Sequence, residues 1–313
     1  VNVVCLSNLN EAEYRKKMCT AYLVKLARML RKELIRQEPD YILPFLWTTC
    51  VRTDLALMGS SLKKHVIQTV RNNPAVFPEN AMMKKYRNNL VRKSRLTIVQ
   101  NNQQKQYFPE TQWDKIKVLP NPVSSTLSQI ERCEDKSQFK IVGVGRLENQ
   151  KNFDLLIDAV ADVSKKYGNV KLDIYGEGSM KDHLQEHIDC MKLGQKITLK
   201  GRSSDYSEIY GSASAFVLSS DFEGMPNTLL EAMAVGLPCI STDCPTGPSD
   251  IIESGKNGIL VPMGDRNRLS QEIENLIQQN EMREDLAKAA KKTILTRYTP
   301  EKITQKFIDI CEE

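Results

Sequence analysis

The chain has 313 residues, of which 41% are hydrophobic and 27% are charged, and its formal net charge is +5. This length allows two domains that each have their own core, and this composition is ordinary for a soluble globular protein. No run of 18 or more apolar residues occurs, which excludes a helix that spans a bilayer.

The charge is unevenly distributed along the chain. Residues 1–122 hold 21 Lys and Arg against 9 Asp and Glu, a net charge of +12, whereas the remaining residues hold 23 against 30, a net charge of −7. A basic face that rests on an anionic membrane surface fits this asymmetry, and a solvated lysine-rich surface is the plainer alternative. Because no aromatic stacking series or DNA-reading motif accompanies the basic half, we expect no nucleic-acid partner.

The cysteines and histidines do not indicate a metal site. The eight cysteines include no pair at C-x2-C spacing, which predicts reduced thiols in a cytosolic protein. His183 and His187 are four residues apart on a predicted helix, but no cysteine or third histidine accompanies them. We interpret them as an exposed helical pair, and we expect no metal ion.

Short apolar strands alternate with helices in residues 1–122. We predict helices at 18–36 and 80–92, and strands at 1–6, 41–46, 64–70, 96–100 and 115–119. This alternation predicts a parallel sheet in a doubly wound α/β domain.

The second half of the chain repeats this pattern. Residues 123–137 are polar and lack periodicity, which predicts a linker, and residues 138–298 form a second α/β domain. We predict its strands from residue 139 and at 170–175, 196–200, 215–218, 238–242 and 258–261, a helix at 281–297, and a terminal helix within 299–313.

The turn after the predicted strand at 215–218 carries the strongest functional signal. Gly224 interrupts the regular secondary structure between this strand and the next helix. Pro226 stands where a helix takes its first residue, a position that needs no backbone N–H. The free amides at such a helix start favour an anion such as phosphate. Glu223 and Glu231 flank this start, and their carboxylates suit a ligand that also carries hydroxyl groups. A nucleotide sugar has both kinds of group.

The spacing from Glu223 to Glu231 resembles the E-x7-E signature of retaining GT-B glycosyltransferases, and the surroundings resemble glycosyltransferase family 4, of the type that builds bacterial surface polysaccharides. The resemblance implies two Rossmann-like domains that face each other across a cleft, with the terminal helix crossing back to the first domain. Members of the family open with a strand and a Gly-rich loop. Residues 1–60 contain no such loop, so we expect the first domain to be incomplete at its N-terminus.

A second motif, at residues 143–152, resembles the G-R-L-x-x-x-K element of the same family. Glu148 stands where a dinucleotide fingerprint has its third glycine, which argues against NAD. The resemblance implies that Arg146 and Lys151 bind the donor diphosphate, where fixed cations stabilise the charge that builds on the departing group. It places Glu223 beside the transferred sugar and Glu231 on the ribose hydroxyls.

The resemblance implies further binding residues. On the donor side these are a G-x-G turn, a residue beside the nucleobase and the backbone around Pro226: Gly176, Gly178, Arg202, Gly224, Met225, Asn227 and Thr228. Residues 244–250 resemble a loop of polysaccharide-building members, and they fit a rigid turn equally well. On the acceptor side, Arg71 and Asn72 resemble an Arg-Asn-Asp-Pro variant, and Trp47 suits either sugar stacking or a core position.

The predicted function is the transfer of a hexose or N-acetylhexosamine from a nucleoside-diphosphate sugar, most simply UDP-linked, to a growing or lipid-linked glycan. We expect no cofactor, and we expect the protein to lie in the cytoplasm or at the inner face of the cell membrane. The alternatives are a sugar-nucleotide epimerase or a phosphorylase on the same fold, and a non-catalytic partner subunit.

Overall fold

The computed structural model describes residues 20–312. The chain divides into two compact units: unit 1 contains residues up to Val99 and Gln104–Val118, and unit 2 contains Gln100–Gln103 and Leu119–Glu313. The strand predicted at 1–6 lies outside the described residues. None of the helices in the described part of the chain has the length and apolarity that a membrane span requires.

Unit 1 is built on a small parallel sheet. Its strands are β1 (Ile67–Val70), β2 (Leu96–Val99) and β3 (Ile116–Val118), in the order β1-β2-β3. Ile67 pairs with Leu96, and Thr97 pairs with Ile116. The strands predicted at 96–100 and 115–119 are therefore confirmed.

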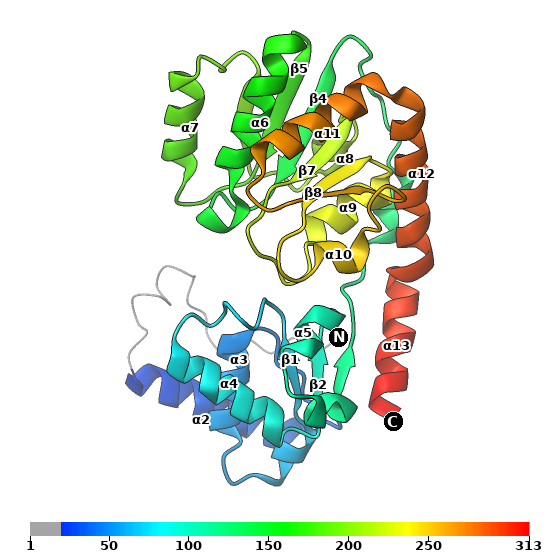
Figure 1. The fold of residues 1–313 in the computed structure, drawn as a ribbon. Coiled ribbons are helices and arrows are strands. Elements are labelled where there is room, and N and C mark those ends of the chain that lie inside the picture. Colours follow the sequence, from blue (N-terminus) through cyan, green and yellow to red (C-terminus); the bar gives the residue numbers. More distant parts are fainter. Residues whose placement is uncertain (1–19, 313) are drawn as a thin grey trace. The chain divides into compact units, whose positions relative to one another are not determined.

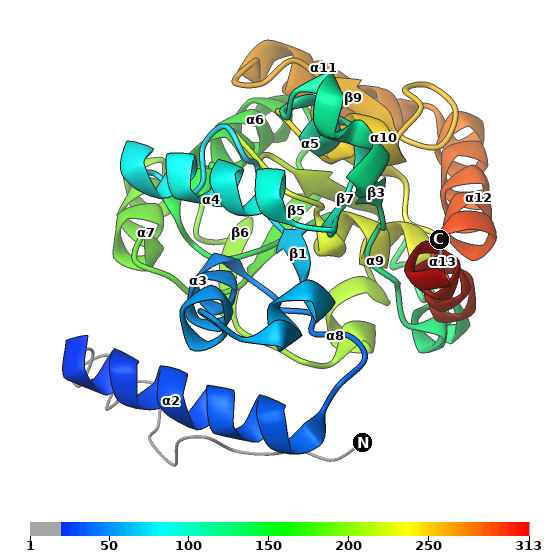
Figure 2. The same ribbon diagram turned by 90° about the horizontal axis from the view of Figure 1, so that it is seen from below.

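The helices of unit 1 are drawn in blue to cyan in Figure 2. They are α2 (Thr20–Gln37), α3 (Trp47–Ala56) and α4 (Ala81–Lys93), and a short α5 (Asn102–Gln106) follows β2. The helices predicted at 18–36 and 80–92 are confirmed over the residues that the structure describes. Asn80 begins α4, since its side chain accepts hydrogen bonds from the backbone N–H groups of Met82 and Met83.

Two strand predictions in unit 1 need correction. Residues 41–46 are not a strand: only Ile42 forms a bridge, to Val66, and helix α3 starts directly afterwards. Pro44 has no N–H to donate to a ladder, and Leu46 has a φ of 70°, which turns the chain. The strand predicted at 64–70 begins only at Ile67, because Ser61–His65 forms a 3-10 turn.

Unit 2 contains a six-stranded parallel sheet (Figure 1). Its strands are β4 (Phe139–Val144), β5 (Val170–Tyr175), β6 (Ile197–Gly201), β7 (Ala215–Leu218), β8 (Cys239–Thr242) and β9 (Ile259–Val261). The order is β6-β5-β4-β7-β8-β9, so the direction of winding reverses between β4 and β7. This confirms the predicted doubly wound α/β domain. Ligands of such sheets bind outside the carboxyl ends of the strands at this reversal.

Both faces of this sheet are covered at its centre, which explains why every residue of β7 is apolar and buried. The helices of unit 2 are α6 (Phe153–Lys166), α7 (Lys181–Cys190), α8 (Tyr206–Tyr210), α9 (Asn227–Val235), α10 (Pro248–Ile251), α11 (Arg266–Gln278), α12 (Asn280–Arg297) and α13 (Pro300–Glu312). Along β7, Ala215 and Val217 pack with α6 and α11, whereas Phe216 and Leu218 pack with α9 and α12. The core of unit 2 therefore has two layers of side chains, one on each face of the sheet.

Candidate functional site

The candidate site lies at the carboxyl ends of the unit 2 strands. Five loops start there, at residue 145 after β4, residue 176 after β5, residue 202 after β6, residue 219 after β7 and residue 243 after β8. Because all six strands are parallel, these loops share one edge of the sheet. The predicted residues on these loops therefore lie at one edge, although Arg146 and Pro226 are 80 residues apart in the chain.

Lys151 and Glu223 form a buried ion pair at this edge. The Lys151 Nζ atom is 2.6 Å from Glu223 Oε1, and the two side chains are only 12% and 7% exposed. The Ser220 hydroxyl donates a second hydrogen bond to the same carboxylate oxygen, at 2.7 Å. Charge-assisted bonds of this kind are strong in a dry environment, so they hold the Glu223 side chain next to the Lys151 cation.

Arg146 is connected to the same turn through Gln150. Its Nη2 atom donates to Gln150 Oε1 at 3.0 Å, and the amide of Gln150 donates to the carbonyl of Phe222 at 2.8 Å. The guanidinium group itself is exposed. A cation that is exposed at its head and tethered at one nitrogen is well placed to bind an incoming anion.

Arg146 also lines a pocket of about 300 Å³ at the ends of β4, β5 and β6. Gly176 and Arg202, both predicted from the sequence, line the same pocket, together with Val144, Tyr175 and Ser203. The size is at the lower end of the range for small-molecule sites. The three loops thus form one hollow with two arginines in its wall.

Gly176 and Gly178 fit the loop of β5 against the loop of β4. A Cβ atom on Gly176 would lie 1.8 Å from the carbonyl oxygen of Gly145, and one on Gly178 would lie 2.3 Å from that of Leu147. Gly176 also has a φ of +151°. Glycine is therefore required here for the close approach of two backbone segments.

Glu231 lies inside α9, eight residues after Glu223. Its Oε2 atom accepts a hydrogen bond from the Tyr210 hydroxyl at 2.9 Å. Burial raises the pKa of the Glu231 carboxyl, and the hydrogen bond from Tyr210 partly offsets that rise. This carboxylate is therefore held in a largely dry position by one donor.

The start of α9 has the features of an anion site. Asn227 is the first helical residue and Pro226 is its cap, one position earlier than the sequence predicts for the proline. Pro226 makes no side-chain cap, so it does not satisfy the first amides of the helix. The Thr228 hydroxyl oxygen is buried and has no hydrogen-bond partner among the described residues.

The segment between Gly224 and Asn227 is held by two asparagines that the sequence analysis missed. The Asn101 amide donates to the carbonyl of Gly224 at 2.6 Å, and the Asn121 amide donates to Asn227 Oδ1 at 2.6 Å. Met225 is buried, and its sulfur accepts from the backbone N–H of Asn121. These contacts span more than 100 residues, so no local pattern could reveal them.

The loop at 244–250 supports the Glu223 turn. The Thr246 hydroxyl donates to the backbone carbonyl of Glu223, and the backbone N–H of Glu223 donates to the carbonyl of Pro245. Gly247 has a φ of +104°, and a Cβ atom there would lie 2.7 Å from Pro226 Cδ. The loop is a tight turn that buttresses the site.

The three acceptor-side candidates belong to unit 1. The Arg71 guanidinium lies 4.9 Å from the centre of the Phe45 ring, and burial lowers its pKa. Asn72 accepts a hydrogen bond from the backbone N–H of Asn73. Trp47 packs edge-on against Tyr86, with ring centres 5.9 Å apart, and stays partly exposed.

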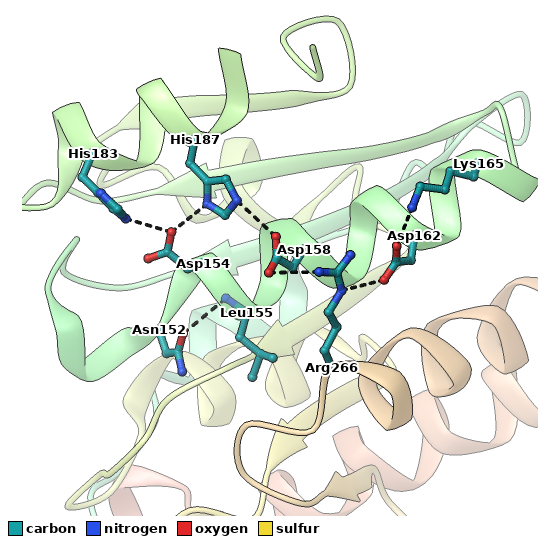
Figure 3. A network of polar contacts seen from close by, with 9 residues as sticks. All are labelled: Asn152, Asp154, Leu155, Asp158, Asp162, Lys165, His183, His187 and Arg266. Atoms are coloured by element: carbon teal, nitrogen blue, oxygen red, sulfur yellow. Dashed lines mark hydrogen bonds and ion pairs between the residues drawn. The ribbon is translucent and has the colours of Figure 1, made fainter. Parts of the chain in front are cut away.

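His183 and His187 face carboxylates of α6, as Figure 3 shows. Asp154 Oδ1 lies 3.0 Å from His183 Nε2 and 2.7 Å from His187 Nδ1, and Asp158 lies 3.1 Å from His187 Nε2. Arg266 continues this ladder to Asp158 and Asp162, so it ties the start of α11 to α6. Within residues 20–312 no group of three or more metal-ligating side chains is arranged to hold a metal ion.

A larger hollow, of about 650 Å³, lies elsewhere in unit 2. Phe139, at the start of β4, and Gly236, just before β8, line it together with Arg132 and Arg283. It therefore lies at the amino ends of the strands, opposite to the edge where ligands of doubly wound sheets bind. We accordingly place the candidate site at the smaller pocket.

Comparison with known families gives one match. The family model described as glycosyl transferases group 1 matches residues 128–293, which is more than half of the 313 residues. The match covers β4 to β9 and so includes every donor-side residue named above.

Curated relatives match about half of the chain. The chain is 33% identical over 172 residues to the poly(ribitol-phosphate) alpha-N-acetylglucosaminyltransferase of Staphylococcus aureus, covering 55% of this chain and 35% of that protein. It is 37% identical over 156 residues to the lipopolysaccharide 1,6-galactosyltransferase of Escherichia coli, covering 48% and 43%. The chain thus spans about a third to about half the length of the curated relatives it matches.

Solved structures extend the likeness of fold over most of the chain. TarM of Staphylococcus aureus matches with a TM-score of 0.78 at 24% identity, covering 92% of this chain and 59% of that one. HepE of Anabaena, solved with UDP-glucose, matches with a TM-score of 0.82 at 17% identity, covering 93% and 83%. The parallel α/β architecture described above is therefore that of the GT-B structures.

Proposed function

The chain belongs to the group 1 glycosyl transferases, and from this we propose that it transfers a sugar from a UDP-linked donor to a surface glycan. The transferred sugar is a hexose or N-acetylhexosamine, and its anomeric configuration is retained. The acceptor is a growing or lipid-linked glycan at an anionic membrane face.

The observation that carries this proposal is the convergence of Arg146, Lys151 and Glu223 at the carboxyl edge of one sheet. Lys151 and Glu223 are 2.6 Å apart, and Gln150 connects Arg146 to the same turn. A cation, a cation–carboxylate pair and an uncapped helix start form a suitable set for a ligand with a diphosphate and hydroxyl groups.

Each group has a role in the proposed transfer. Bond breaking at the anomeric carbon leaves negative charge on the departing UDP. Arg146, Lys151 and the first amides of α9 stabilise that charge without reorganising, because they are fixed before the reaction. Glu223 accepts hydrogen bonds from the sugar hydroxyls, and Glu231 accepts them from the ribose.

We further propose that these cations neutralise the charge of the UDP diphosphate, as a divalent ion does in metal-dependent transferases. UDP affinity is then unchanged when EDTA is added.

The relatives support the choice of donor and acceptor class. By their descriptions, one named relative is an N-acetylglucosaminyltransferase for poly(ribitol-phosphate) and the other is a galactosyltransferase for lipopolysaccharide, and HepE is described in complex with UDP-glucose. The basic N-terminal half of this chain, with its net charge of +12, suits an acceptor held at an anionic surface.

The test is a calorimetric titration of the full chain with UDP. Replacing Arg146 by Ala removes charge-assisted hydrogen bonds worth about 1.5–3 kcal/mol each, which predicts roughly 10- to 100-fold weaker binding. Glu231→Ala is expected to weaken binding to a similar degree.

The control for this titration is Arg266→Ala, whose side chain pairs with Asp158 and Asp162 on α6. It is expected to bind UDP as the unmodified chain does. Unchanged affinity in both Arg146→Ala and Glu231→Ala would overturn the assignment. Formation of a new glycosidic bond, rather than an isomerised donor, then separates transfer from epimerisation.

A further inference from the structure

Tyr210 is a buried residue that the proposed mechanism does not yet use. It is the last residue of α8, its side chain is fully buried, and its ring packs edge-on against Phe216 of β7. Its hydroxyl lies 2.9 Å from Glu231 Oε2 and 3.4 Å from the carbonyl of Thr228. Because a tyrosine has one O–H, the nearer and charged acceptor receives the stronger bond.

This hydrogen bond is the one that Glu231 makes among the described residues. Burial raises the pKa of Tyr210 well above its ordinary value, so the hydroxyl stays protonated and acts as a donor. The Tyr210 ring is fully buried and packs against Phe216, which holds the hydroxyl in place. The hydrogen bond from Tyr210 therefore orients the Glu231 carboxylate.

We propose that Tyr210 is a positioning residue that holds the Glu231 carboxylate ready to accept hydrogen bonds from the ribose hydroxyls of the donor. The inference rests on the proposed function, since it assigns Glu231 to the ribose. It adds that the preference for a ribonucleotide depends on a tyrosine that never touches the ligand.

The ionisation of Glu231 provides a second test of this role, through the dependence of UDP affinity on pH. A protonated carboxyl accepts hydrogen bonds poorly, so affinity for UDP falls as the pH drops through the raised pKa of Glu231. The bond from Tyr210 lowers that pKa. Removing the hydroxyl moves the pKa up, and the loss of affinity on acidification then begins at a higher pH.

The decisive variant is Tyr210→Phe, which keeps the ring and removes the hydroxyl. The full chain is titrated by calorimetry with UDP and with 2′,3′-dideoxy-UDP, at neutral pH and over a series down to pH 5. We expect Tyr210→Phe to bind UDP about tenfold more weakly, as the loss of one hydrogen bond to a charged group predicts. Its affinity for the dideoxy nucleotide is expected to be unchanged, because that ligand makes no use of Glu231.

Two controls separate positioning from general damage. Tyr298→Phe removes the hydroxyl of another buried tyrosine of unit 2, which donates to the carbonyl of Asp250, and it is expected to leave both affinities unchanged. Glu231→Gln keeps an acceptor oxygen but loses the charge, so it is expected to reduce the ribose preference and to remove the dependence on pH. In transfer assays, Tyr210→Phe is expected to raise the KM for the donor with little change in kcat.

The outcomes distinguish this inference from the proposed function. Equal weakening of UDP and dideoxy-UDP in Tyr210→Phe, or an unshifted pH profile, would overturn the role of Tyr210 and leave the function standing. An unmodified chain that binds no UDP, or that binds both nucleotides equally, would overturn the assignment of Glu231 and this inference with it.

Discussion

At the scale of single residues, the central feature is a cation that is already paired before any ligand arrives. Lys151 and Glu223 lie 2.6 Å apart and are almost fully buried. The sequence predicts both as site residues, but as partners of the donor. Their bond to each other follows from the pairing of β4 with β7, which brings two loops 72 residues apart together. Lys151 therefore has a structural role as well as the proposed catalytic one.

Replacing Lys151 by Ala is expected to destabilise unit 2. It leaves the Glu223 carboxylate buried without its cation, which typically costs about 3 kcal/mol or more. For a unit of this size that corresponds to a drop in Tm of roughly 6 to 12 °C. Tryptophan fluorescence would report on unit 1, because both Trp47 and Trp113 lie there. Far-UV circular dichroism is therefore used to follow the melting of unit 2.

The matched control is Lys165→Ala, whose ion pair with Asp162 is exposed and so contributes little. The double variant Lys151→Ala, Glu223→Ala is expected to recover part of the lost stability, since no buried charge remains. If Lys151→Ala melts at the same temperature as Lys165→Ala, the pair is not important for the fold.

At the scale of elements, the apolar runs of unit 2 predict its strands well because both faces of the sheet are covered. The run at 215–218 is a strand at the predicted bounds. The strand predicted at 41–46 fails, and α3 follows it although Thr48, Thr49 and Val51 favour strands. Tertiary packing overrides propensity here, since Cys50 and Ala56 are buried on the inner face of α3.

The strand order and the asparagine contacts of the site could not be predicted from local sequence patterns. A pattern in the sequence fixes which residues are apolar, but the order β6-β5-β4-β7-β8-β9 depends on how helices cross between strands. Asn101, Asn121 and Tyr210 reach the site only through that order. Arg146 and Glu231, in contrast, could be proposed as site residues from the sequence, because each belongs to a motif with short local spacing.

The interlocked loops after β4 and β5 give a prediction at this scale. Gly176→Ala is expected to weaken UDP binding and to lower the Tm, because its Cβ atom would collide with the backbone of Gly145 and its φ disfavours any side chain. Calorimetry and thermal melts measure the two effects.

The control for this variant is Gly194→Ala, where a Cβ atom would have no heavy atom within 4 Å. It is expected to behave as the unmodified chain. A Gly176→Ala variant with unchanged binding would show that the two loops do not shape the pocket.

At the scale of the whole molecule, the charge of the chain is divided between its halves. Residues 1–122 carry +12. Within them α4 (Ala81–Lys93) has basic residues and no acid, and Met82 is 73% exposed at its start. A basic helix with an exposed apolar side chain suits an anionic bilayer surface, where each lysine or arginine contributes about 1 kcal/mol.

We therefore expect the full chain to sediment with vesicles that contain anionic lipid and not with neutral phosphatidylcholine vesicles. The triple change Lys85→Glu, Arg92→Glu, Lys93→Glu on α4 is expected to release it at physiological salt. The matching change Lys181→Glu, Lys192→Glu, Lys256→Glu in unit 2 serves as the control. Equal binding of both variants would contradict a membrane role for α4.

The most direct measurement for the whole account is a structure of the chain with UDP bound. We predict that the diphosphate lies at the carboxyl edge of the unit 2 sheet, within hydrogen-bond distance of Arg146 and the start of α9, with the ribose on Glu231. UDP bound instead in the larger hollow beside Arg132 and Phe139, with the carboxyl edge empty, would contradict it.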